Sequence, residues 1–395
     1  MPEVLALGLL LFVLIGFGLY EGHAHVRIRR GIPVRIHVNG TRGKSSVARL
    51  IAAGLRAGGI RTFAKATGTA PRFIFPDGHE QVIPRRGMPN IIEQVGAFRQ
   101  AQRAGARAIV VECMALRPDL QRLTEQRMVA STLSVISNVR ADHLDVMGPS
   151  LRMVARALSQ TIPARQTFAT AEDDGLMREV LLAEARRLGN RIIVAEARSV
   201  TDQMMSGFPY LEHRANVALA LAVCEHLGVG PAVALQGMHQ MVPDPGALRT
   251  YRYTLRGKRV EFINALSAND PDSIVRIWSR MAVQFRDGQT KIVLLNNRKD
   301  RLPRSVDLVR CIGAQLSIDC VVLAGEDQPV VRRIFERFVG DRIRLVVCGK
   351  VRPHVVYRHV MEHCTSDNVV FAIGNVGGIG HAIADCFVRA WAKHA

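Results

Sequence analysis

The sequence predicts an α/β protein with an N-terminal membrane helix, a central domain built on a parallel sheet and a smaller C-terminal α/β domain. Three observations lead to this prediction. The chain opens with one long apolar segment, β-branched strands alternate with helical stretches after it, and a linker rich in Pro and Gly divides that alternation. The predicted boundaries are residues 1–22 for the membrane anchor, 34–245 for the central domain and 250–395 for the C-terminal domain.

The segment from Val4 to Tyr20 contains no charged residue over its 17 positions. As a helix it would extend roughly 25 Å, just enough to cross the hydrocarbon core of a bilayer. A cleaved signal peptide is the alternative, but the residues before the segment lack its basic start. The basic residues follow instead, at Arg27, Arg29, Arg30 and Arg35. By the positive-inside rule we expect a single-pass inner-membrane protein whose domains are cytoplasmic.

The composition is that of a globular protein with a large excess of basic residues. Hydrophobic residues make up 48% of the chain and charged residues 22%, which excludes a disordered or coiled-coil protein. The 53 Lys and Arg exceed the 34 Asp and Glu and give a net charge of +19. This excess indicates either an anionic partner or arginines used as general solvated cations. Aromatic residues make up only 5%, which argues against nucleic acid bound by base stacking.

Seven cysteines are scattered through the 395 residues, and no two have C-x-x-C spacing. This pattern fits neither a disulfide framework nor a zinc site. Most of the cysteines lie in apolar runs, so we expect small buried side chains in a protein whose main part is in a reducing compartment.

A phosphate-binding loop is predicted after the β-branched strand Val34–Val38 and before a helical stretch from Val47 to Ala57. The loop consists of Gly40, Thr41, Arg42, Gly43, Lys44, Ser45 and Ser46. Glycines let backbone N–H groups face an anion, and the N-terminus of the helix adds its dipole. Lys44 would contact the β- and γ-phosphates, and Ser45 would bind Mg²⁺. Val38 replaces the first glycine of the longer form of this motif, so the shorter form G-T-x-G-K-S applies.

Two further predicted strands end in groups that could bind a metal ion. The strand 107–112 carries Glu112 at its C-terminal end, and the strand 131–137 is followed by Asn138, Asp142, His143 and Asp145. Ligands collect at the C-terminal edge of a parallel sheet, so Glu112 is placed as a Mg²⁺ ligand and His143 at a second ion or a substrate group. Either alone would be weak evidence, since many strands end in Glu and a lone His is more often a solvated loop residue.

The order and spacing of these motifs resemble the Mur ligase superfamily, whose members join an amino acid to a carboxylate using ATP. The helical stretch that begins at His213 and contains Asn216 resembles its adenine-side helix, and residues 262–271, with Asn269, resemble its loop over ATP. Within the superfamily the chain resembles the poly-γ-glutamate synthases, over almost its whole length. The segments that carry this resemblance are Ala64–Arg72, Asn90–Gln94, Ala268–Pro271, Leu295–Arg301 and Ile373–Gly378.

The resemblance implies an ADP-forming, ATP-dependent acid–amino-acid ligase that polymerises glutamate through its γ-carboxylate, with an acyl-phosphate intermediate. It implies ATP and Mg²⁺ as cofactors, a P-loop fold like that of the Mur ligases for the central domain and a Rossmann-like C-terminal domain. Residues 40–46, Asn216 and Asn269 would bind the nucleotide; Lys44, His143 and Arg249 would act in catalysis. The implied partners are glutamate, the poly-γ-glutamate chain and a small integral membrane subunit, without nucleic acid; a homo-oligomer is left open.

The sequence departs from the superfamily in two respects. We expect no domain for a UDP-linked substrate, because the phosphate loop begins directly after the anchor. The lysine that many Mur ligases carbamylate is missing, since the aligned stretch is Val154–Ala157 and no Lys occurs between Lys65 and Lys258. The acids at 172–174 are near in sequence, but their place before a helix favours capping. A second Mg²⁺ would therefore be held differently or be absent.

The C-terminal part is predicted as a second α/β unit after a linker at Val242–Gly246. Strands are predicted at residues 260–263, 291–295, 320–324 and 369–373. The glycine-rich stretch 374–380 indicates a tight turn rather than a dinucleotide-binding loop. Arg249, just past the linker, would reach the ATP phosphates or face solvent at the hinge. The last helix carries Ile383, Phe387 and Trp391 on one face, as core residues do.

Two alternative functions are retained. A folylpolyglutamate-synthase-like ligase shares the two-domain plan, although a membrane anchor argues against a soluble folate substrate. A membrane-tethered P-loop ATPase that exports an anionic polymer is the alternative from another class of protein. Release of ADP that depends on an amino acid would separate a ligase from such a motor.

Overall fold

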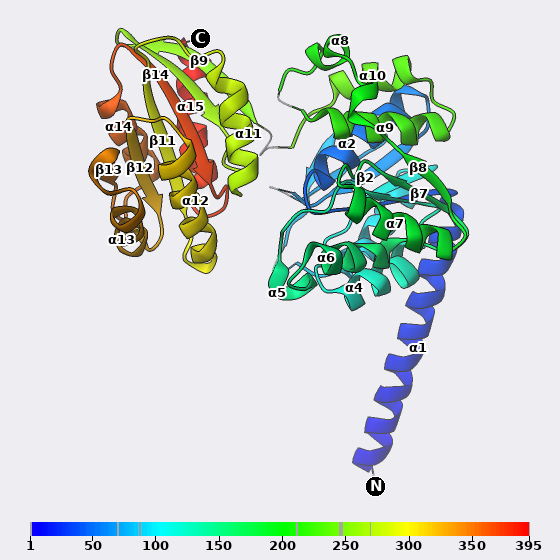
Figure 1. The fold of residues 1–395 in the computed structure, drawn as a ribbon. Helices are drawn as coiled ribbons and strands as arrows, with labels where there is room; N and C mark the ends of the chain where they lie inside the picture. The colour runs from blue at the N-terminus through cyan, green and yellow to red at the C-terminus, as the bar shows by residue number, and fades with distance from the viewer. Residues whose placement is uncertain are drawn as a thin grey trace. The chain divides into compact units, whose positions relative to one another are not determined.

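The computed structural model describes residues 2–68, 71–85, 87, 89–210, 212–244, 248–268 and 270–394 (Figure 1). The chain divides into two compact units, Met1–Asp244 and Pro245–Ala395. This division falls within the stretch expected to be a linker. Each unit has its own sheet and its own buried core.

The sheet of the first unit has eight strands in the order β4-β3-β2-β5-β1-β6-β7-β8. Strands β2, β5, β1, β6, β7 and β8 pair in parallel, and the short strands β3 and β4 pair antiparallel at one edge. The bounds are β1 (Val34–Asn39), β2 (Thr62–Ala66), β3 (Arg72–Ile74), β4 (Glu80–Val82), β5 (Ala108–Glu112), β6 (Leu133–Ile136), β7 (Thr167–Thr170) and β8 (Arg191–Val194).

Helices cover both faces of this sheet (Figure 1). The helices of this unit are α1 (Pro2–Gly31), α2 (Lys44–Ala57), α3 (Glu93–Arg103), α4 (Pro118–Leu123), α5 (Leu144–Met147), α6 (Leu151–Leu158), α7 (Gly175–Arg187), α8 (Asp202–Ser206), α9 (Arg214–His226) and α10 (Pro231–Gln240). A π-helical turn, η1 (Thr124–Val129), continues α4, and short 3₁₀ turns lie at η2 (Ser159–Thr161) and η3 (Ala197–Ser199).

The strands predicted at 34–38, 107–112 and 131–137 are confirmed as β1, β5 and β6. Every residue of β5 and β6 is buried, as is the C-terminal part of β1, which explains their continuous β-branched and apolar sequences. The helix predicted from Val47 begins earlier, at Lys44, so the last loop residues form its first turn. This start brings the N-terminus of α2 directly to the loop.

The apolar N-terminal segment is part of one continuous helix, α1, that is longer than the predicted anchor. Its first part projects from the unit with exposed apolar side chains, and the window Ala6–Gly31 is long and apolar enough to cross a membrane (Figure 1). Its last turns pack on the unit instead. Glu21 pairs with Arg99 of α3 at 2.6 Å, and His25 Nε2 contacts Met128 O of η1 at 2.7 Å. Residues 21–31 thus belong to the folded unit.

The second unit has a six-stranded sheet in the order β13-β12-β11-β14-β10-β9, parallel except for the edge pair β9 and β10. Its strands are β9 (Arg249–Leu255), β10 (Lys258–Asn264), β11 (Thr290–Asn297), β12 (Cys320–Gly325), β13 (Arg344–Val347) and β14 (Asp367–Gly374). Its helices are α11 (Pro271–Ala282), α12 (Leu302–Gln315), α13 (Gln328–Phe338), α14 (Pro353–His363) and α15 (Gly380–His394), with 3₁₀ turns η4 (Lys299–Arg301) and η5 (Gly340–Arg342).

The four strands predicted in this unit are confirmed, as β10, β11, β12 and β14. On the last helix, Ile383 and Phe387 are fully buried, while Trp391 is 37% exposed and contacts Tyr251 of β9. The prediction of a core face is thus confirmed for its first two residues. Gly374 ends β14 with φ 108°, and a Cβ there would lie 2.4 Å from Asn296 O. The stretch 374–380 is therefore a strand-to-helix turn, as expected.

Candidate active site

The phosphate loop connects the end of β1 to the first turn of α2. Its backbone requires glycine at two positions, because Gly40 has φ 132° and Gly43 has φ 77°. A Cβ at Gly40 would lie 2.0 Å from Ser137 Oγ, and one at Gly43 would lie 2.7 Å from Asn216 Oδ1. No side chain caps α2, so the first-turn N–H groups are left for an anion.

The ammonium group of Lys44 turns back over the loop. Its Nζ donates to Gly40 O at 2.7 Å and to Thr41 O at 3.3 Å. A phosphate oxygen is a stronger partner for an ammonium group than a carbonyl oxygen, because the hydrogen bond is then charge-assisted at both ends. The same side chain can therefore close the loop when no anion is bound and hold a phosphate when one is.

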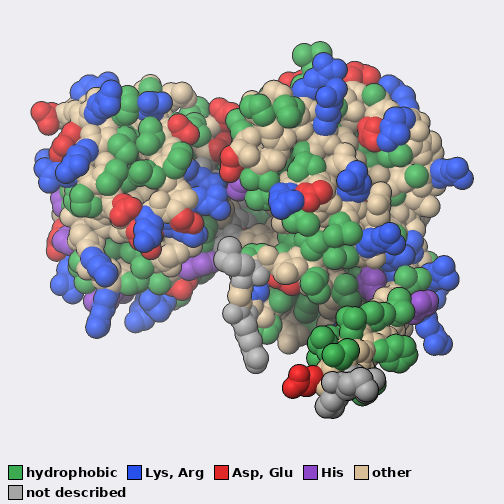
Figure 2. Space-filling model, turned by 90° about the horizontal axis from the view of Figure 1, so that it is seen from below, with side chains coloured by type: hydrophobic (Ala, Val, Ile, Leu, Met, Phe, Trp, Pro, Cys, Tyr) green, Lys and Arg blue, Asp and Glu red, His purple; other side chains and the backbone are tan. Residues whose placement is uncertain are grey.

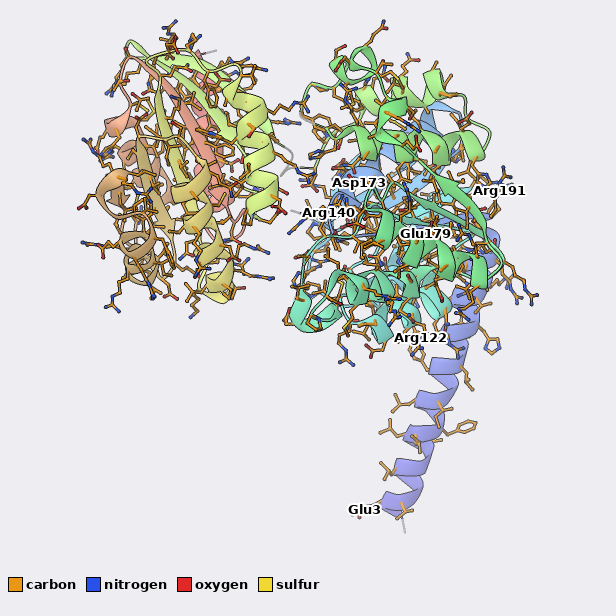
Figure 3. The ribbon with its side chains drawn as sticks, viewed as in Figure 1. Glu3, Arg122, Arg140, Asp173, Glu179 and Arg191 are labelled. Atoms are coloured by element: carbon orange, nitrogen blue, oxygen red, sulfur yellow. The ribbon has the colours of Figure 1, made fainter. Side chains whose placement is uncertain are left out.

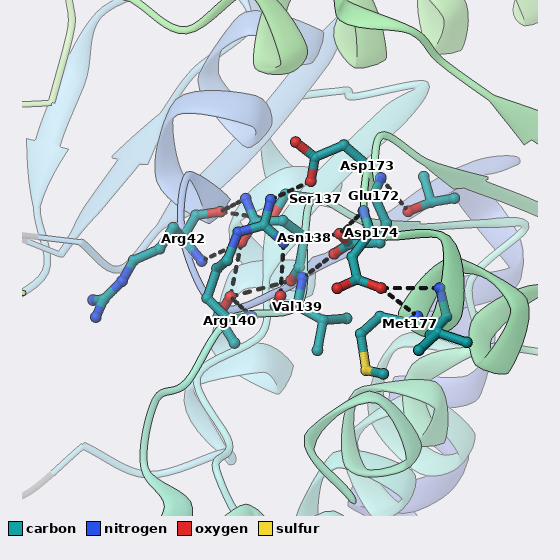
Figure 4. Close-up of polar contacts among 12 residues, drawn as sticks. Arg42, Ser137, Asn138, Val139, Arg140, Glu172, Asp173, Asp174 and Met177 are labelled. Atoms are coloured by element: carbon teal, nitrogen blue, oxygen red, sulfur yellow. Dashed lines mark hydrogen bonds and ion pairs between the residues drawn. The ribbon is translucent and has the colours of Figure 1, made fainter. Parts of the chain in front are cut away.

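Asn138, at the end of the neighbouring strand β6, holds the loop in place (Figure 4). Its Oδ1 accepts from Thr41 Oγ1 at 2.8 Å and from the Arg42 backbone N–H at 3.1 Å. Its Nδ2 donates to Arg42 O at 3.1 Å, and Ser137 Oγ donates to the same oxygen at 2.6 Å. One amide side chain thus satisfies both a donor and an acceptor of the loop backbone, which fixes the loop against the sheet.

Glu172 supports the segment that carries Asn138 (Figure 4). Its buried carboxylate accepts from the Val139 backbone N–H and, at 2.8 Å, from Arg140 Nη1; Arg140 also pairs with Asp173. Burial acts to lower the pKa of Arg140, but its hydrogen bonds and ion pairs with the carboxylates of Glu172 and Asp173 together outweigh burial and raise that pKa. The expectation that residues 172–174 cap a helix is correct only for Asp174, whose Oδ1 accepts from Leu176 N and Met177 N at the start of α7.

Glu112 ends β5 beside the phosphate loop and is almost fully buried. Its Oε2 accepts from Ser45 Oγ at 2.8 Å and from the Thr67 backbone N–H at 2.5 Å. The contact arises from topology, since β5 pairs in parallel with β1 and both strands end at the same edge. Two residues predicted as metal ligands from separate motifs, Ser45 and Glu112, are therefore in direct contact.

A cavity of about 210 Å³ lies at this edge of the sheet. Residues at or after the ends of β1, β2, β5 and β6 line it, among them Gly40, Lys44, Thr67, Glu112, Asp142 and His143, together with Gln121. His143 has φ 46° at the start of α5, and its Nε2 lies 3.9 Å from Asp142 Oδ1. Asp142 in turn lies 3.7 Å from Arg42 of the loop. The cavity thus combines cationic groups for phosphates with carboxylates for a metal ion.

The donor set at this cavity fits Mg²⁺. Ser45 and Glu112 offer a hydroxyl and a carboxylate oxygen, which are the ligands that a hard cation prefers, and Mg²⁺ commonly keeps several waters beside one or two protein ligands. Among the described residues no group of three or more His, Cys, Asp or Glu side chains could enclose a metal ion. The structure therefore suits an ion held by few protein atoms and by phosphate oxygens.

Sequence reasoning missed a buried lysine next to the cavity. Lys65 of β2 is fully buried, and its Nζ lies 3.2 Å from Glu93 Oε2 and 3.2 Å from Gln94 Oε1. Burial lowers the pKa of Lys65, and the Glu93 carboxylate acts against that shift. Gln94 Nε2 also donates to Glu112 O at 3.0 Å, so this cluster positions the end of β5. A lysine in the middle of an otherwise apolar strand was the available signal.

For three predicted site residues the assigned roles stay predictions. Asn216 lies against Gly43, but its Nδ2 donates to Glu212 Oε1 at 2.8 Å, so a role at adenine stays a prediction. Arg249 is the first residue of β9 in the second unit, and its contact with phosphate likewise stays a prediction. Asn269 lies outside the described residues. Its neighbour Asp270 caps α11 by accepting from Ser273 N at 3.0 Å.

Comparison with known proteins identifies both parts of the chain. Residues 38–240 match the Mur ligase middle domain, and residues 250–390 match the poly-gamma-glutamate synthase CapB C-terminal domain. The capsule biosynthesis protein CapB of Bacillus anthracis is 33% identical over 98% of this chain and 83% of its own length. The PGA synthase CapB of Bacillus subtilis (strain 168) is 30% identical over 94% of this chain and 95% of its own.

The fold also occurs among solved structures. The bifunctional folylpolyglutamate synthase/dihydrofolate synthase of Yersinia pestis, complexed with AMPPNP and a Mn ion, superposes with a TM-score of 0.68. It is 16% identical in sequence, and the match covers 92% of each chain. At this identity the likeness shows a shared fold, and the predicted fold class is thereby confirmed.

Proposed function

The chain belongs to the CapB family of poly-gamma-glutamate synthases, which carries a Mur ligase middle domain, and on that premise we propose its reaction and the residues that perform it. The protein is an ATP-dependent amide ligase of poly-γ-glutamate synthesis. ATP phosphorylates a glutamate carboxylate to an acyl phosphate, with release of ADP. The amine of the next unit then displaces inorganic phosphate and forms the amide bond.

In such a reaction, this chain's own residues orient the reacting phosphates and neutralise their charge. Lys44 exchanges its carbonyl partners for phosphate oxygens, and the N–H groups of the loop and of α2 hold the remaining charge. Asn138 keeps the loop in the conformation in which these donors converge. His143 and Asp142, which line the same cavity, act at the acceptor end of the reaction in this proposal.

Mg²⁺ would be held by Ser45 and Glu112, and when bound it would neutralise phosphate charge. The contact of Ser45 Oγ with Glu112 Oε2 supports this assignment, because it brings two hard oxygen ligands together beside the phosphate loop. A nucleotide complex with Mn in the Yersinia pestis relative, at 16% identity, is compatible with a divalent cation.

The remaining parts of the proposal concern location and partners. Helix α1 anchors the chain in the membrane, which its length, apolar composition and following arginines support. The two units are cytoplasmic, and a small integral membrane subunit completes the synthase. For Arg249 and Asn269, a role in nucleotide binding is proposed from the sequence resemblance alone.

The convergence of Lys44, Glu112 and His143 on one cavity is the observation that carries this proposal. Replacing Lys44 by Met keeps the length of the side chain and removes its charge. We expect the purified variant to remain folded and membrane-bound and to make no polymer. Normal polymer yield from Lys44→Met would show that the loop does not bind the reacting phosphates.

A folylpolyglutamate-synthase activity is the second candidate, because the fold is shared with that enzyme of Yersinia pestis. The proposal favours the polymer, since the family match spans both units and the chain carries an apolar helix. Incubation with a reduced folate and glutamate distinguishes the two, because only a folate ligase would extend the folate.

A further inference from the structure

One face of the first unit lies on the side from which α1 projects (Figure 1). This face carries exposed apolar side chains together with exposed arginines. Helices α4, α5 and α6 form this face in Figure 1, and Figure 3 places Arg122 of α4 beside the point where α1 leaves the unit. We call it the α4–α6 face. It is continuous with α1 in space, since η1 extends α4 and accepts hydrogen bonds from His25 and Arg29 of α1.

Large apolar side chains are exposed along the α4–α6 face. They are Leu116, Leu123, Leu144, Leu151 and Met153, each between 36% and 45% exposed. Single exposed apolar residues need no explanation, but several on adjoining elements indicate a contact surface. Figure 2 views the molecule from this side and shows hydrophobic side chains interspersed with Lys and Arg.

Exposed arginines accompany these apolar side chains: Arg117, Arg122, Arg127, Arg152 and Arg156. The exposed carboxylates within residues 116–156 are Asp119, which pairs with Arg117 at 2.7 Å, and Asp145. The face is therefore cationic overall. Arginine and leucine side chains together are the composition of a surface that lies at the head-group level of an anionic membrane.

The docking of α1 fixes how this face can meet a bilayer. Residues 2–20 would extend roughly 28 Å as a helix, which matches the hydrocarbon core, so Glu21 and His25 would lie at the membrane surface. These same residues hold α1 to α3 and η1. Because α1 is one unbroken helix, the unit cannot turn freely on its anchor, and the α4–α6 face is held towards the head groups.

We propose that the α4–α6 face rests on the bilayer and binds anionic lipid head groups through its arginines while its leucines enter the interface. Leu116 lines the catalytic cavity, and Leu144 follows His143 directly in sequence. The cavity therefore borders the surface that contacts the membrane. Ligation takes place beside the bilayer, where the growing polyanion can pass to a membrane subunit. This inference rests on the membrane placement of α1 proposed above.

Fluorescence quenching on the full-length chain in lipid nanodiscs tests the proposal. Cys386 is the one cysteine that is not buried, so a Cys386→Ser background confines labelling to the introduced thiol. A fluorophore is placed at Leu123→Cys or Leu151→Cys on the face. The matched control is Val233→Cys, whose side chain is 43% exposed; its helix, α10, lies at the opposite end of the unit (Figure 1). Leu11→Cys in α1 serves as the reference for insertion.

With nitroxide on the lipid head groups, we expect strong quenching at positions 123 and 151 and none at 233. Removing anionic lipid, or introducing Arg122→Gln, should weaken the quenching at 123, with roughly fivefold weaker association for each lost arginine. Equal, weak quenching at positions 123, 151 and 233 would overturn the proposal. If Leu11→Cys were still quenched by a nitroxide on the acyl chains, the membrane anchor would remain supported. If Leu11→Cys were also unquenched, the membrane placement of α1 itself would be wrong.

Discussion

The contact of Ser45 with Glu112 is the most informative single interaction in the site, because it joins two motifs that are 67 residues apart. We expect Glu112→Gln, which keeps the volume of the side chain, to lower ATP turnover on the order of a hundredfold, as for loss of one preorganised charge.

The variant His143→Ala should bind ATP normally but fail to ligate. Nucleotide binding and Mg²⁺ titrations of turnover measure both effects.

The matched control for these two variants is Glu184→Gln, which breaks an exposed pair with Arg187 on α7 and should change neither property. Wild-type ligation by His143→Ala at every Mg²⁺ concentration would show that the Asp142–His143 segment is structural.

A buried ion pair joins β1 to η1. His37 Nδ1 is 2.7 Å from Glu125 Oε2, and both side chains are buried. Burial acts to lower the pKa of His37, but its contacts with Cys113 and Glu125 outweigh this and raise it to about 10. A histidine whose pKa is raised by folding stabilises the fold fully below its unfolded value of 6.5 and loses that contribution as pH rises through about 10.

We therefore expect the melting temperature of the wild type to fall between pH 7 and pH 10 by an amount that Glu125→Gln removes. The variant should also cost about 3 kcal/mol at neutral pH, because it leaves a buried charge without its partner. Thermal unfolding in detergent across this pH range is the measurement. Parallel pH profiles for the two proteins would contradict the pairing.

The sequence predicted the residues of the site better than their neighbours. Gly40 to Ser46, Glu112 and His143 follow strands, and parallel strands must end at one edge, so their convergence could be expected. The residues that support the site from behind could not be predicted in this way. Lys65 pairs with Glu93 across 28 positions, and Glu172 reaches Val139 across 33, through contacts that depend on tertiary packing and have no local pattern.

At the scale of elements, the phosphate loop depends on the end of β6. Asn138→Ala removes three hydrogen bonds to the loop, each worth about 1 kcal/mol, and we expect ATP binding to weaken by about tenfold or more. Asn190→Ala is the control, since Asn190 makes similar bonds to Gln166 N and Pro163 O far from the loop. Isothermal titration calorimetry measures the affinity of both variants for ATP. Equal affinities would mean that the loop keeps its conformation without the hydrogen bonds of Asn138.

Helix α1 has two parts with different roles, and truncation separates them. Deleting residues 1–19 should give a soluble chain with the melting behaviour of the full-length protein, because Glu21, His25 and Ile28 remain docked. Deleting residues 1–31 should destabilise the first unit by about 3 kcal/mol, through lost apolar contacts and hydrogen bonds. Equal thermal stability of the two truncations would show that residues 20–31 are not part of the folded unit.

Elements with a strong local pattern were predictable, and short ones were not. The buried β-branched runs of β1 and β5 read as strands from sequence alone. Strands β3 and β4 have three residues each, and β2 contains Lys65, so neither length nor hydrophobicity signals them. The polar residues after Tyr20 indicate the end of a membrane anchor, but they do not show that the helix continues to Gly31, because the contacts of Glu21 and His25 with α3 and η1 depend on tertiary packing.

In the whole molecule, the arginines behind the net charge of +19 fall into at least two groups. Some arginines hold the fold, as Arg140 does with Glu172 and Asp173. Others remain on the surface, among them those of the α4–α6 face. Part of the basic excess thus serves the fold, and the exposed arginines of the α4–α6 face are the part that we propose to bind anionic head groups.

Glutamate-dependent release of ADP tests the central claim most directly. The membrane complex that contains this chain is purified and given Mg²⁺-ATP with each amino acid in turn, and ADP and polymer are measured together. For a poly-γ-glutamate ligase, we expect that glutamate alone stimulates ADP release, in step with γ-linked polymer, and that Lys44→Met abolishes both. ADP release at the same rate without any amino acid would contradict it and indicate an ATPase instead of a ligase.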